Sequence, residues 1–312
     1  MRENLTSGSR WQGMETRQGD GTEALSEEME SNGSATPKSR RHPLTLPADL
    51  LRFAPQTADA HRWATFSTRG TNMRQWLAGL DGNETDLQRL CKLMQSKTAT
   101  VFMGLAGYYL KSTDLEALTS VESALKTAQA LTTLIDNSAS LVSNNLGRLD
   151  INEIVELLPD GSGRRYAVQD GVVSHIARII PSFLTPVYDN STLSPEPESD
   201  LVERALDASK QNPAVADALR FFRHGDWMNL YKVFEIIRDS DGNVDQLIRR
   251  NWITRRNLNR FTQTAQSRAA IGDAARHASK KYTPHAEHMS LDEARATILK
   301  LLVSWIAARQ GT

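Results

Sequence analysis

The sequence has little cysteine, no net charge and no long apolar run, and each shortage excludes a class of protein. Cys91 is the only cysteine among 312 residues, which excludes an intrachain disulfide and a zinc site built from several cysteines. Lysine and arginine together number 37, as do aspartate and glutamate, so no overall field draws the chain to nucleic acid or to a membrane. No stretch approaches the roughly 20 apolar residues that span a bilayer.

Familiar catalytic signatures are missing as well. The sequence contains no nucleophile elbow, no dinucleotide-binding fingerprint and no paired-carboxylate motif. Its first 42 residues are polar throughout and lack the apolar core of a secretion signal. We therefore expect a cytoplasmic protein that stays out of the membrane and uses neither a cofactor nor a metal.

Composition divides the chain into four segments. Residues 1–45 are rich in Gly, Ser, Thr and Glu without apolar periodicity, which is typical of a disordered tail. We expect an α+β domain at 46–187, a linker at 188–200 ("YDNSTLSPEPESD") and a helical bundle at 201–312. The predicted fold class is thus α+β: a mixed N-terminal domain with a few strands and a long helix precedes an all-α C-terminal bundle.

Three patterns define the predicted N-terminal domain. The stretch "TATVFMGLAGYYL" (98–110) favours a buried strand over a short helix. Apolar residues at three- and four-residue intervals in 112–137 predict one amphipathic helix, capped by Ser112 or Thr113. Turn residues around Pro159 and the "QDG" before Val172 predict successive antiparallel strands.

Local start signals mark the helices of the C-terminal region. Asn212 followed by Pro213 is typical of a cap and first helical residue, and "DWMNLYKVFEIIR" (226–238) carries one apolar face. Ser290 with Glu293 forms a capping box before the last helix. The predicted core stripe of that helix comprises Leu291, Ala294, Ile298, Leu301, Leu302, Trp305 and Ile306.

The strongest local signal is electrostatic, because residues 247–281 carry nine basic residues against one acidic residue, Asp273. Such a stretch, with Trp252 and Phe261 for stacking, would bind the phosphates and bases of RNA. The alternative is that these charges lie on solvated helix faces and pair with carboxylates elsewhere in the fold. The predicted nucleic-acid contacts are Arg249, Arg250, Arg255, Arg256, Arg260, Arg268, Lys280 and Lys281.

Arg276 and His277 are the candidate catalytic residues. An arginine beside a histidine can stabilise a negatively charged phosphate while the imidazole moves a proton near neutral pH. Alternatively, the pair ends a helix, where both side chains interact favourably with the last carbonyls. A zinc site made with the nearby histidines lacks the helical spacing that presents two ligands together.

Three segments, "DWMNLYKVFEIIR", "RFTQTAQSRAAIGDAARHA" and "HMSLDEARATILKLLVSWI", resemble the HEPN family of helical bundles over about the last 110 residues. Many members are metal-independent ribonucleases of bacterial defence and toxin systems. Their Arg and His lie about four to six residues apart before the last helix, and a dimer brings two copies together. The resemblance implies catalysis by Arg276 and His277, although these two residues are adjacent in this chain.

Two hypotheses follow. The first is an RNA-binding protein that acts as a metal-independent endoribonuclease of a defence or toxin system, paired with an antitoxin or with a second copy. The second is a non-catalytic adaptor or sensor whose bundle mediates dimerisation or partner binding. The first requires the arginines to face solvent instead of pairing with carboxylates of the same chain.

Overall fold

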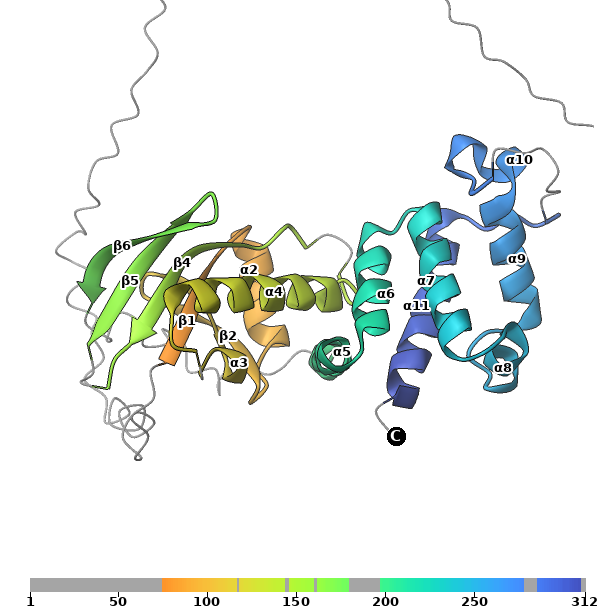
Figure 1. Ribbon diagram of the computed structural model, residues 1–312. Helices are drawn as coiled ribbons and strands as arrows, with labels where there is room; N and C mark the ends of the chain where they lie inside the picture. The colour runs from red at the N-terminus through yellow and green to blue at the C-terminus, as the bar shows by residue number, and fades with distance from the viewer. Residues whose placement is uncertain are drawn as a thin grey trace, which may run out of the picture. The chain divides into compact units, whose positions relative to one another are not determined.

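The computed structural model describes residues 75–309 except 117, 144–145, 160–161, 180–196 and 278–284. The predicted tail at 1–45 and most of the predicted linker at 188–200 lie outside these residues. The predicted domain boundaries stay predictions. The predicted class is confirmed, because the described chain combines one antiparallel sheet with many helices (Figure 1).

The sheet contains six strands in the order β2-β3-β1-β4-β5-β6, and every neighbouring pair is antiparallel. The strands are β1 (Gln75–Asp81), β2 (Ala99–Gly104), β3 (Gly107–Ser112), β4 (Asp150–Leu157), β5 (Gly163–Gln169) and β6 (Val172–Ile179). The single strand predicted at 98–110 is therefore a hairpin of two strands. In the predicted turn before β6, Asp170 and Gly171 both have positive φ, the backbone that a tight two-residue hairpin requires.

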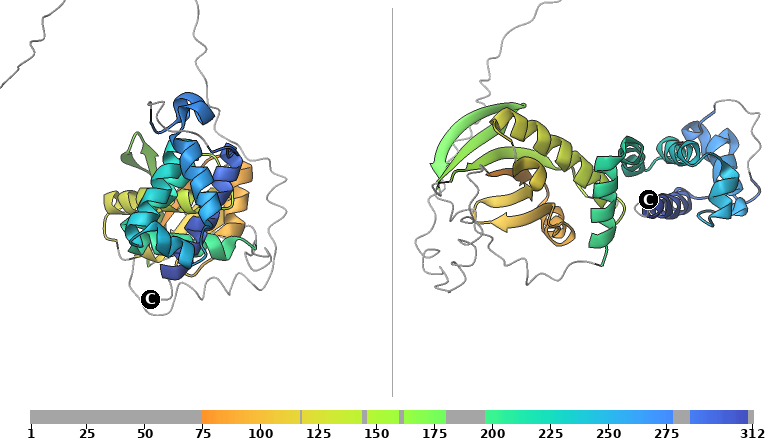
Figure 2. Two further views of the ribbon diagram at one scale, coloured as in Figure 1. Left: turned by 90° about the vertical axis from the view of Figure 1, so that its right-hand side faces the viewer. Right: turned by 60° about the horizontal axis from the view of Figure 1, so that its bottom comes forward.

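One face of the sheet packs against α4 (Val121–Ala139), which runs across the strands (Figures 1 and 2). Its cap is Ser120, whose side chain accepts a hydrogen bond from the Ser123 N–H at 3.2 Å. The predicted helix at 112–137 thus begins later than expected, because Ser112 ends β3 and Thr113 opens the short α3 (Thr113–Glu116). Another helix, α2 (Glu84–Leu93), connects β1 to β2.

The remainder of the described chain is helical. Its elements are α5 (Ser199–Gln211), α6 (Pro213–His224), α7 (Trp227–Ser240), α8 (Val244–Arg249), α9 (Arg255–Gln266), α10 (Arg268–Ile271), the 3-10 turn η4 (Gly272–Ala274) and α11 (Leu291–Arg309). The predicted start of α6 is confirmed, since the Asn212 side chain accepts from the Ala214 N–H at 2.9 Å. Among the described helices, none is both long and apolar enough to cross a membrane.

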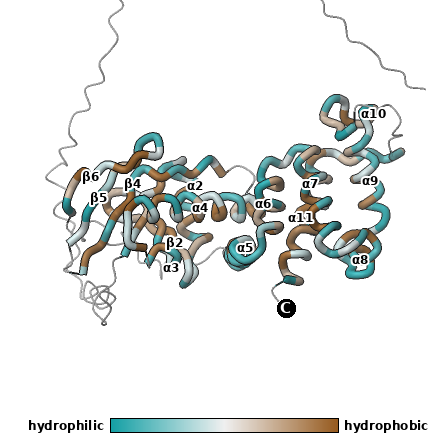
Figure 3. Tube along the Cα trace, viewed as in Figure 1, coloured by the Kyte–Doolittle hydropathy of each residue, from teal (hydrophilic) through white to brown (hydrophobic). Residues whose placement is uncertain are grey.

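Two large hydrophobic clusters stabilise these layers. One lies between the sheet and α2 and α4, and the other fills the space enclosed by α6, α7, α9 and α11. Figure 3 shows apolar residues along α7 and α11 and mostly polar residues along α8 and α9. Helix α5 serves both clusters, because Val202 and Leu206 pack in the first while Ala205 and Ala208 pack in the second.

The predicted capping box of α11 is confirmed. The Ser290 N–H donates to Glu293 Oε2 at 2.8 Å, and the Glu293 N–H donates to Ser290 Oγ at 3.1 Å. The first of these bonds also lowers the pKa of Glu293. The sequence SLDE therefore sets where the last helix begins.

Replacing Ser290 with alanine is expected to lower the free energy of unfolding by about 1 kcal/mol, because the Glu293 N–H loses its acceptor. Urea unfolding followed by circular dichroism measures the change. Ser304→Ala on the same helix is the matched control, since its hydroxyl only donates back to the Lys300 carbonyl. Equal losses in the two variants would contradict a capping role for Ser290.

Candidate functional site

Arg276 is held in the segment that connects η4 to α11. Its backbone N–H donates to the Ala265 carbonyl at 2.9 Å, so the backbone of Arg276 satisfies a carbonyl at the C-terminal end of α9. Its guanidinium carbon lies 4.5 Å from the centre of the Tyr231 ring. On the same side, Arg276 Nη2 lies 2.9 Å from Glu235 Oε1. The side chain thus contacts an aromatic ring and a carboxylate of α7 at once.

The two partners of Arg276 share one face of α7, because Tyr231 and Glu235 are four residues apart. Tyr231 is itself fixed by the core, since it stacks on Phe261 and its hydroxyl accepts from Gln266 Nε2 at 2.7 Å. Arg276 is only 32% exposed, and Glu235 is 26% exposed. Sequence analysis missed both partners, although their four-residue spacing in "YKVFE" would have placed them together.

His277 follows directly, and its side chain is partly buried. The helix-end alternative for this pair is wrong in its detail, because both residues lie after η4 and outside any helix. Arg276 and His277 are therefore neighbours because they are consecutive in the chain, and the fold adds no further contact between them among the described interactions. Lys280 and Lys281, two of the predicted nucleic-acid contacts, lie outside the described residues.

The other predicted contacts are mostly paired with carboxylates of the same chain. The pairs are Arg250 with Asp241 (2.9 Å), Arg255 with Asp245 (2.5 Å), Arg256 with Glu287 (2.7 Å), Arg260 with Glu293 (3.5 Å) and Arg268 with Asp273 (2.6 Å). Arg260 is the least exposed of these arginines, and it also donates to the backbone carbonyls of Glu287 and His288. This arginine therefore joins α9 to the segment before α11.

The carboxylates explain why a count along the chain overstates the positive charge. Four of the five pairing acids lie outside residues 247–281, and the fold brings them back: Asp241, Asp245, Glu287 and Glu293. Arg249 differs, because it is exposed and pairs with no carboxylate in the part of the chain that the structure describes. The helical surface is consequently close to neutral around α8 and α9.

These surface pairs are open to solvent. Arg256 and Glu287 are 70% and 58% exposed, and Arg255 and Asp245 are similarly exposed. Hydrogen bonding to Arg256 still lowers the pKa of Glu287, so this carboxylate stays charged at neutral pH. Exposed pairs of this kind contribute little to stability. They balance charge without holding the arginines rigidly.

The predicted stacking residues behave differently from expectation. Phe261 is fully buried and stacks on Trp227 and Tyr231, so the prediction that it reaches a base is wrong. Trp252 is partly exposed, but the Arg250 guanidinium carbon lies 4.8 Å from the centre of its ring. The apolar face of α9 faces the core, which is why its aromatic residue is inaccessible.

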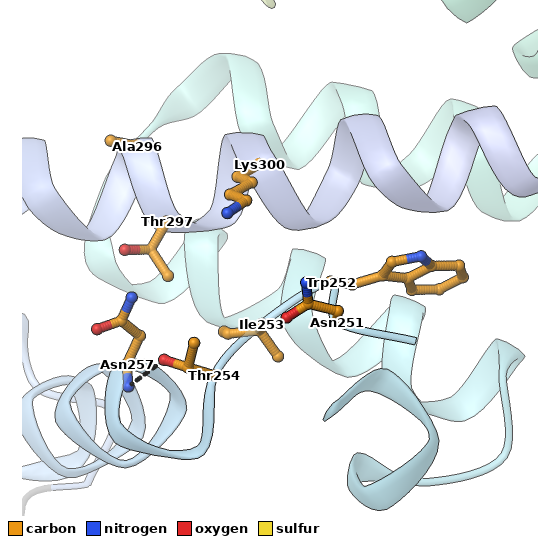
Figure 4. A pocket seen from close by; sticks show the side chains of 8 residues that line it. All are labelled: Asn251, Trp252, Ile253, Thr254, Asn257, Ala296, Thr297 and Lys300. Atoms are coloured by element: carbon orange, nitrogen blue, oxygen red, sulfur yellow. Dashed lines mark hydrogen bonds between the residues drawn. The ribbon is translucent and has the colours of Figure 1, made fainter. Parts of the chain in front are cut away.

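A small hollow lies beside this region, between α11 and the connection from α8 to α9 (Figure 4). Its volume is about 220 Å³, below the roughly 300 Å³ at which pockets for drug-sized molecules begin. Figure 4 shows Thr297 and Lys300 on α11 across from Thr254 and Asn257. The hollow is lined by Asn251, Trp252, Ile253, Thr254, Asn257, Ala296, Thr297 and Lys300.

A larger hollow of about 440 Å³ lies where α4 meets the start of β4 and the end of α6. Its lining includes Asp136, with Oδ1 2.7 Å from Arg223 Nη1. Burial raises the pKa of Asp136 to about 6, although the adjacent Arg223 lowers it. Sequence analysis found no signal for this hollow, because its residues are far apart in the chain and form no motif.

Comparison with family models, with curated proteins and with solved structures finds no match. The resemblance to HEPN bundles and the roles that it implies for Arg276 and His277 therefore stay predictions. The described residues show that Tyr231 and Glu235 bind the Arg276 guanidinium. The neighbouring surface of α8 and α9 carries arginines that are mostly paired with carboxylates.

Proposed function

We propose that this chain is a non-catalytic adaptor or sensor that works by dimerisation or partner binding. The observation that carries the proposal is the placement of Arg276, whose guanidinium contacts Glu235 and Tyr231 of its own chain. A phosphate would have to displace the Glu235 carboxylate or approach a pair without net charge. Neither arrangement favours stabilisation of a transition state on RNA.

The balanced surface supports the same proposal. Affinity for RNA depends on unpaired cations that replace counterions along the phosphate backbone. Five of the predicted contacts already have carboxylate partners. We also propose that the all-α region at 201–312 is a separate domain and that this domain is the binding module. The resemblance to HEPN bundles implies the same role, because members that have lost the Arg and His motif act as scaffolds or binding modules.

RNA binding is the second candidate, with cleavage by a metal-independent route in a bacterial defence or toxin system. One observation favours it: Arg249 is exposed without a carboxylate partner among the described residues, and the neighbouring pairs are weak enough to exchange with phosphate. In this reaction the 2′-hydroxyl of RNA attacks the adjacent phosphate to form a 2′,3′-cyclic phosphate, while the bond to the 5′-oxygen of the next nucleotide breaks and that oxygen takes up a proton. His277 would move the proton, and Arg276 would stabilise the phosphate charge after leaving Glu235.

Purified protein incubated with RNA in EDTA separates the two proposals. We expect the RNA to stay intact and the Arg276→Ala/His277→Ala double variant to behave as the wild type does, because the guanidinium is occupied. Gel analysis of the RNA and a binding titration at several salt concentrations are the measurements. Cleavage that the double variant loses would establish the ribonuclease instead.

A matched pair of variants tests whether Glu235 is what occupies Arg276. Glu235→Gln and Asp239→Asn each remove one negative charge from α7, but Asp239 pairs with Arg238 and not with Arg276. If the pairing masks the guanidinium, Glu235→Gln raises RNA affinity more than Asp239→Asn does. Equal gains would show that only the total charge matters.

A further inference from the structure

The larger hollow has room for a small molecule. Its volume of about 440 Å³ lies within the range of roughly 300–1,000 Å³ that is typical of pockets for such ligands. Its lining comes from α4, from the start of β4 and from Arg223 near the end of α6. Leu149, which is buried, and Ile151, which is partly buried, make part of the wall apolar. The remaining lining residues are polar or charged.

Two acceptors on α4 line this hollow without hydrogen bonds of their own. Thr132 is only 4% exposed, and its hydroxyl oxygen has no hydrogen-bond partner in the described chain. The same holds for Oδ1 of Asp136, which is also buried. The two residues are four positions apart, so they share one face of the helix. Buried polar atoms are normally satisfied, and two unsatisfied acceptors in one hollow therefore indicate a ligand that donates hydrogen bonds.

Arg223 does not satisfy the carboxylate, although its Nη1 lies 2.7 Å from Asp136 Oδ1. The described hydrogen bonds of Arg223 go to backbone carbonyls instead. Nη1 donates to the carbonyl of Asp136 and Nη2 to that of Leu146, each at 3.3 Å. The side chain of Asp136 also keeps 13% of its surface exposed. The carboxylate thus lies beside a positive charge and can still accept hydrogen bonds from the hollow.

The charges of the lining favour a ligand that donates over one that accepts. Arg148, the other arginine of the lining, has its Nε 3.2 Å from Asp150 Oδ1, and both side chains are exposed. Both guanidinium groups of the hollow are therefore engaged, so an anionic ligand would compete with a carboxylate at either one. A ligand with N–H groups meets acceptors that have no competing donor. Hydrogen bonds between ionised partners are also stronger than those between neutral ones.

We propose that this hollow binds a small molecule with a primary ammonium group, which donates to the Asp136 carboxylate and to the Thr132 hydroxyl. An ammonium carries three N–H donors, enough for two acceptors one helical turn apart. The inference goes beyond the proposed function, because α4 and β4 form most of the hollow and the helical region contributes only Arg223. The surface that binds a partner stays where the proposed function puts it.

Isothermal titration calorimetry of the full chain at pH 8 tests the site. The probe is butylamine, and 1-butanol is its uncharged counterpart. We expect butylamine to bind at least about tenfold more tightly, because only the amine forms charge-assisted hydrogen bonds with Asp136. Equal affinities for the two probes, or no binding of butylamine, would overturn the proposal.

A third probe distinguishes two sources of the ammonium group. The compound 4-aminobutanoate carries the same ammonium and adds a carboxylate that can reach the exposed Arg148. Tighter binding of 4-aminobutanoate than of butylamine identifies the ligand class as amino acids, and the reverse order identifies it as simple amines. Both orders require the ammonium group and so support the site.

Matched variants test the two acceptors. Asp136→Asn should weaken butylamine binding about tenfold, and Thr132→Val, which loses a neutral hydrogen bond, about threefold. Asp217→Asn is the control for charge, since Asp217 forms an exposed pair on α6 outside the hollow. Thr262→Val is the control for the hydroxyl, because that hydroxyl donates to the Leu258 carbonyl at 2.9 Å on α9. Losses in the controls as large as those in the hollow would contradict the assignment, and circular dichroism verifies that each variant is folded.

Butylamine affinity should also depend on pH through Asp136. Burial raises the pKa of Asp136 to about 6, while the nearby Arg223 and Arg148 lower it and Asp150 and Asp86 raise it. At pH 5 only about a tenth of this carboxylate is ionised, whereas the amine stays protonated, so binding should be about tenfold weaker than at pH 8. Asp136→Asn should remove the dependence. An affinity of the wild type that is the same at both pH values argues against contact with Asp136.

The outcomes of these experiments are separable from those of the RNA assay. A chain that leaves RNA intact and does not bind butylamine would refute the ammonium site and leave the adaptor proposal standing. A chain that binds butylamine and cleaves RNA through Arg276 and His277 would refute the adaptor proposal and leave the ammonium site standing.

Discussion

Trp305→Ala is expected to lower the free energy of unfolding by about 3–5 kcal/mol, the loss typical of emptying a buried tryptophan site. Trp305 is fully buried on α11 and packs in the cluster enclosed by the helices. Its removal leaves a cavity that the neighbouring helices cannot fill without shifting. Urea unfolding followed by far-ultraviolet circular dichroism measures the loss without depending on tryptophan fluorescence.

Two further variants test whether the lost side-chain volume causes the destabilisation of Trp305→Ala. Leu291→Ala lies on the same helix, but Leu291 is 41% exposed, so its loss should stay below about 1 kcal/mol. Trp305→Phe keeps most of the volume and removes an indole N–H that has no hydrogen-bond partner among the described residues. Trp305→Phe should therefore lower the free energy of unfolding much less than Trp305→Ala does. Comparable losses for phenylalanine and alanine would argue against a cavity effect.

The second large effect is a dependence of stability on pH through Asp136. Its folded pKa, about 6, lies above the ordinary value of 3.8, so the folded state binds the proton more tightly than the unfolded state does. Between about pH 4 and pH 6 the folded state therefore carries more protons, and stability falls as pH rises. At about 1.4 kcal/mol per pKa unit, the contribution lost by pH 7 is roughly 3 kcal/mol.

Asp136→Asn removes this titration. Because the amide cannot ionise, the stability of the variant relative to the wild type should rise by up to about 3 kcal/mol between pH 4 and pH 7. The variant also loses the ion pair with Arg223, which shifts its free energy of unfolding at every pH without changing how that energy depends on pH. Urea unfolding across this range measures it, with Asp150→Asn as the exposed control from the same hollow. A difference that stays constant with pH contradicts the burial of Asp136.

Much of the helical fold could be predicted because its signals are local. Asn212 with Pro213 and Ser290 with Glu293 specify helix starts within four residues of sequence, and both predictions are confirmed. The hairpin of β2 and β3 was missed for the converse reason. Its turn consists of Leu105 and Ala106, which are not typical turn residues, so the pattern reads as one strand.

The candidate site could be predicted only in part, because charge pairing depends on tertiary structure. The arginine-rich stretch is visible in the sequence, but its carboxylate partners lie beyond both of its ends. Arg276 binds Tyr231, which lies 45 residues earlier in the chain, and no local pattern joins the two. The burial of Phe261 likewise follows from which face of α9 meets α7.

The position of α5 has a consequence for how the molecule unfolds. Its residues Leu206 and Ala208, two positions apart, belong to the cluster beneath the sheet and to the cluster among the helices. Disrupting either hydrophobic cluster removes packing contacts from α5 and so destabilises the other cluster. Sheet and helices are therefore thermodynamically coupled, and a fragment that starts at α6 would lack α5 and expose the parts of α6 and α11 that α5 contacts.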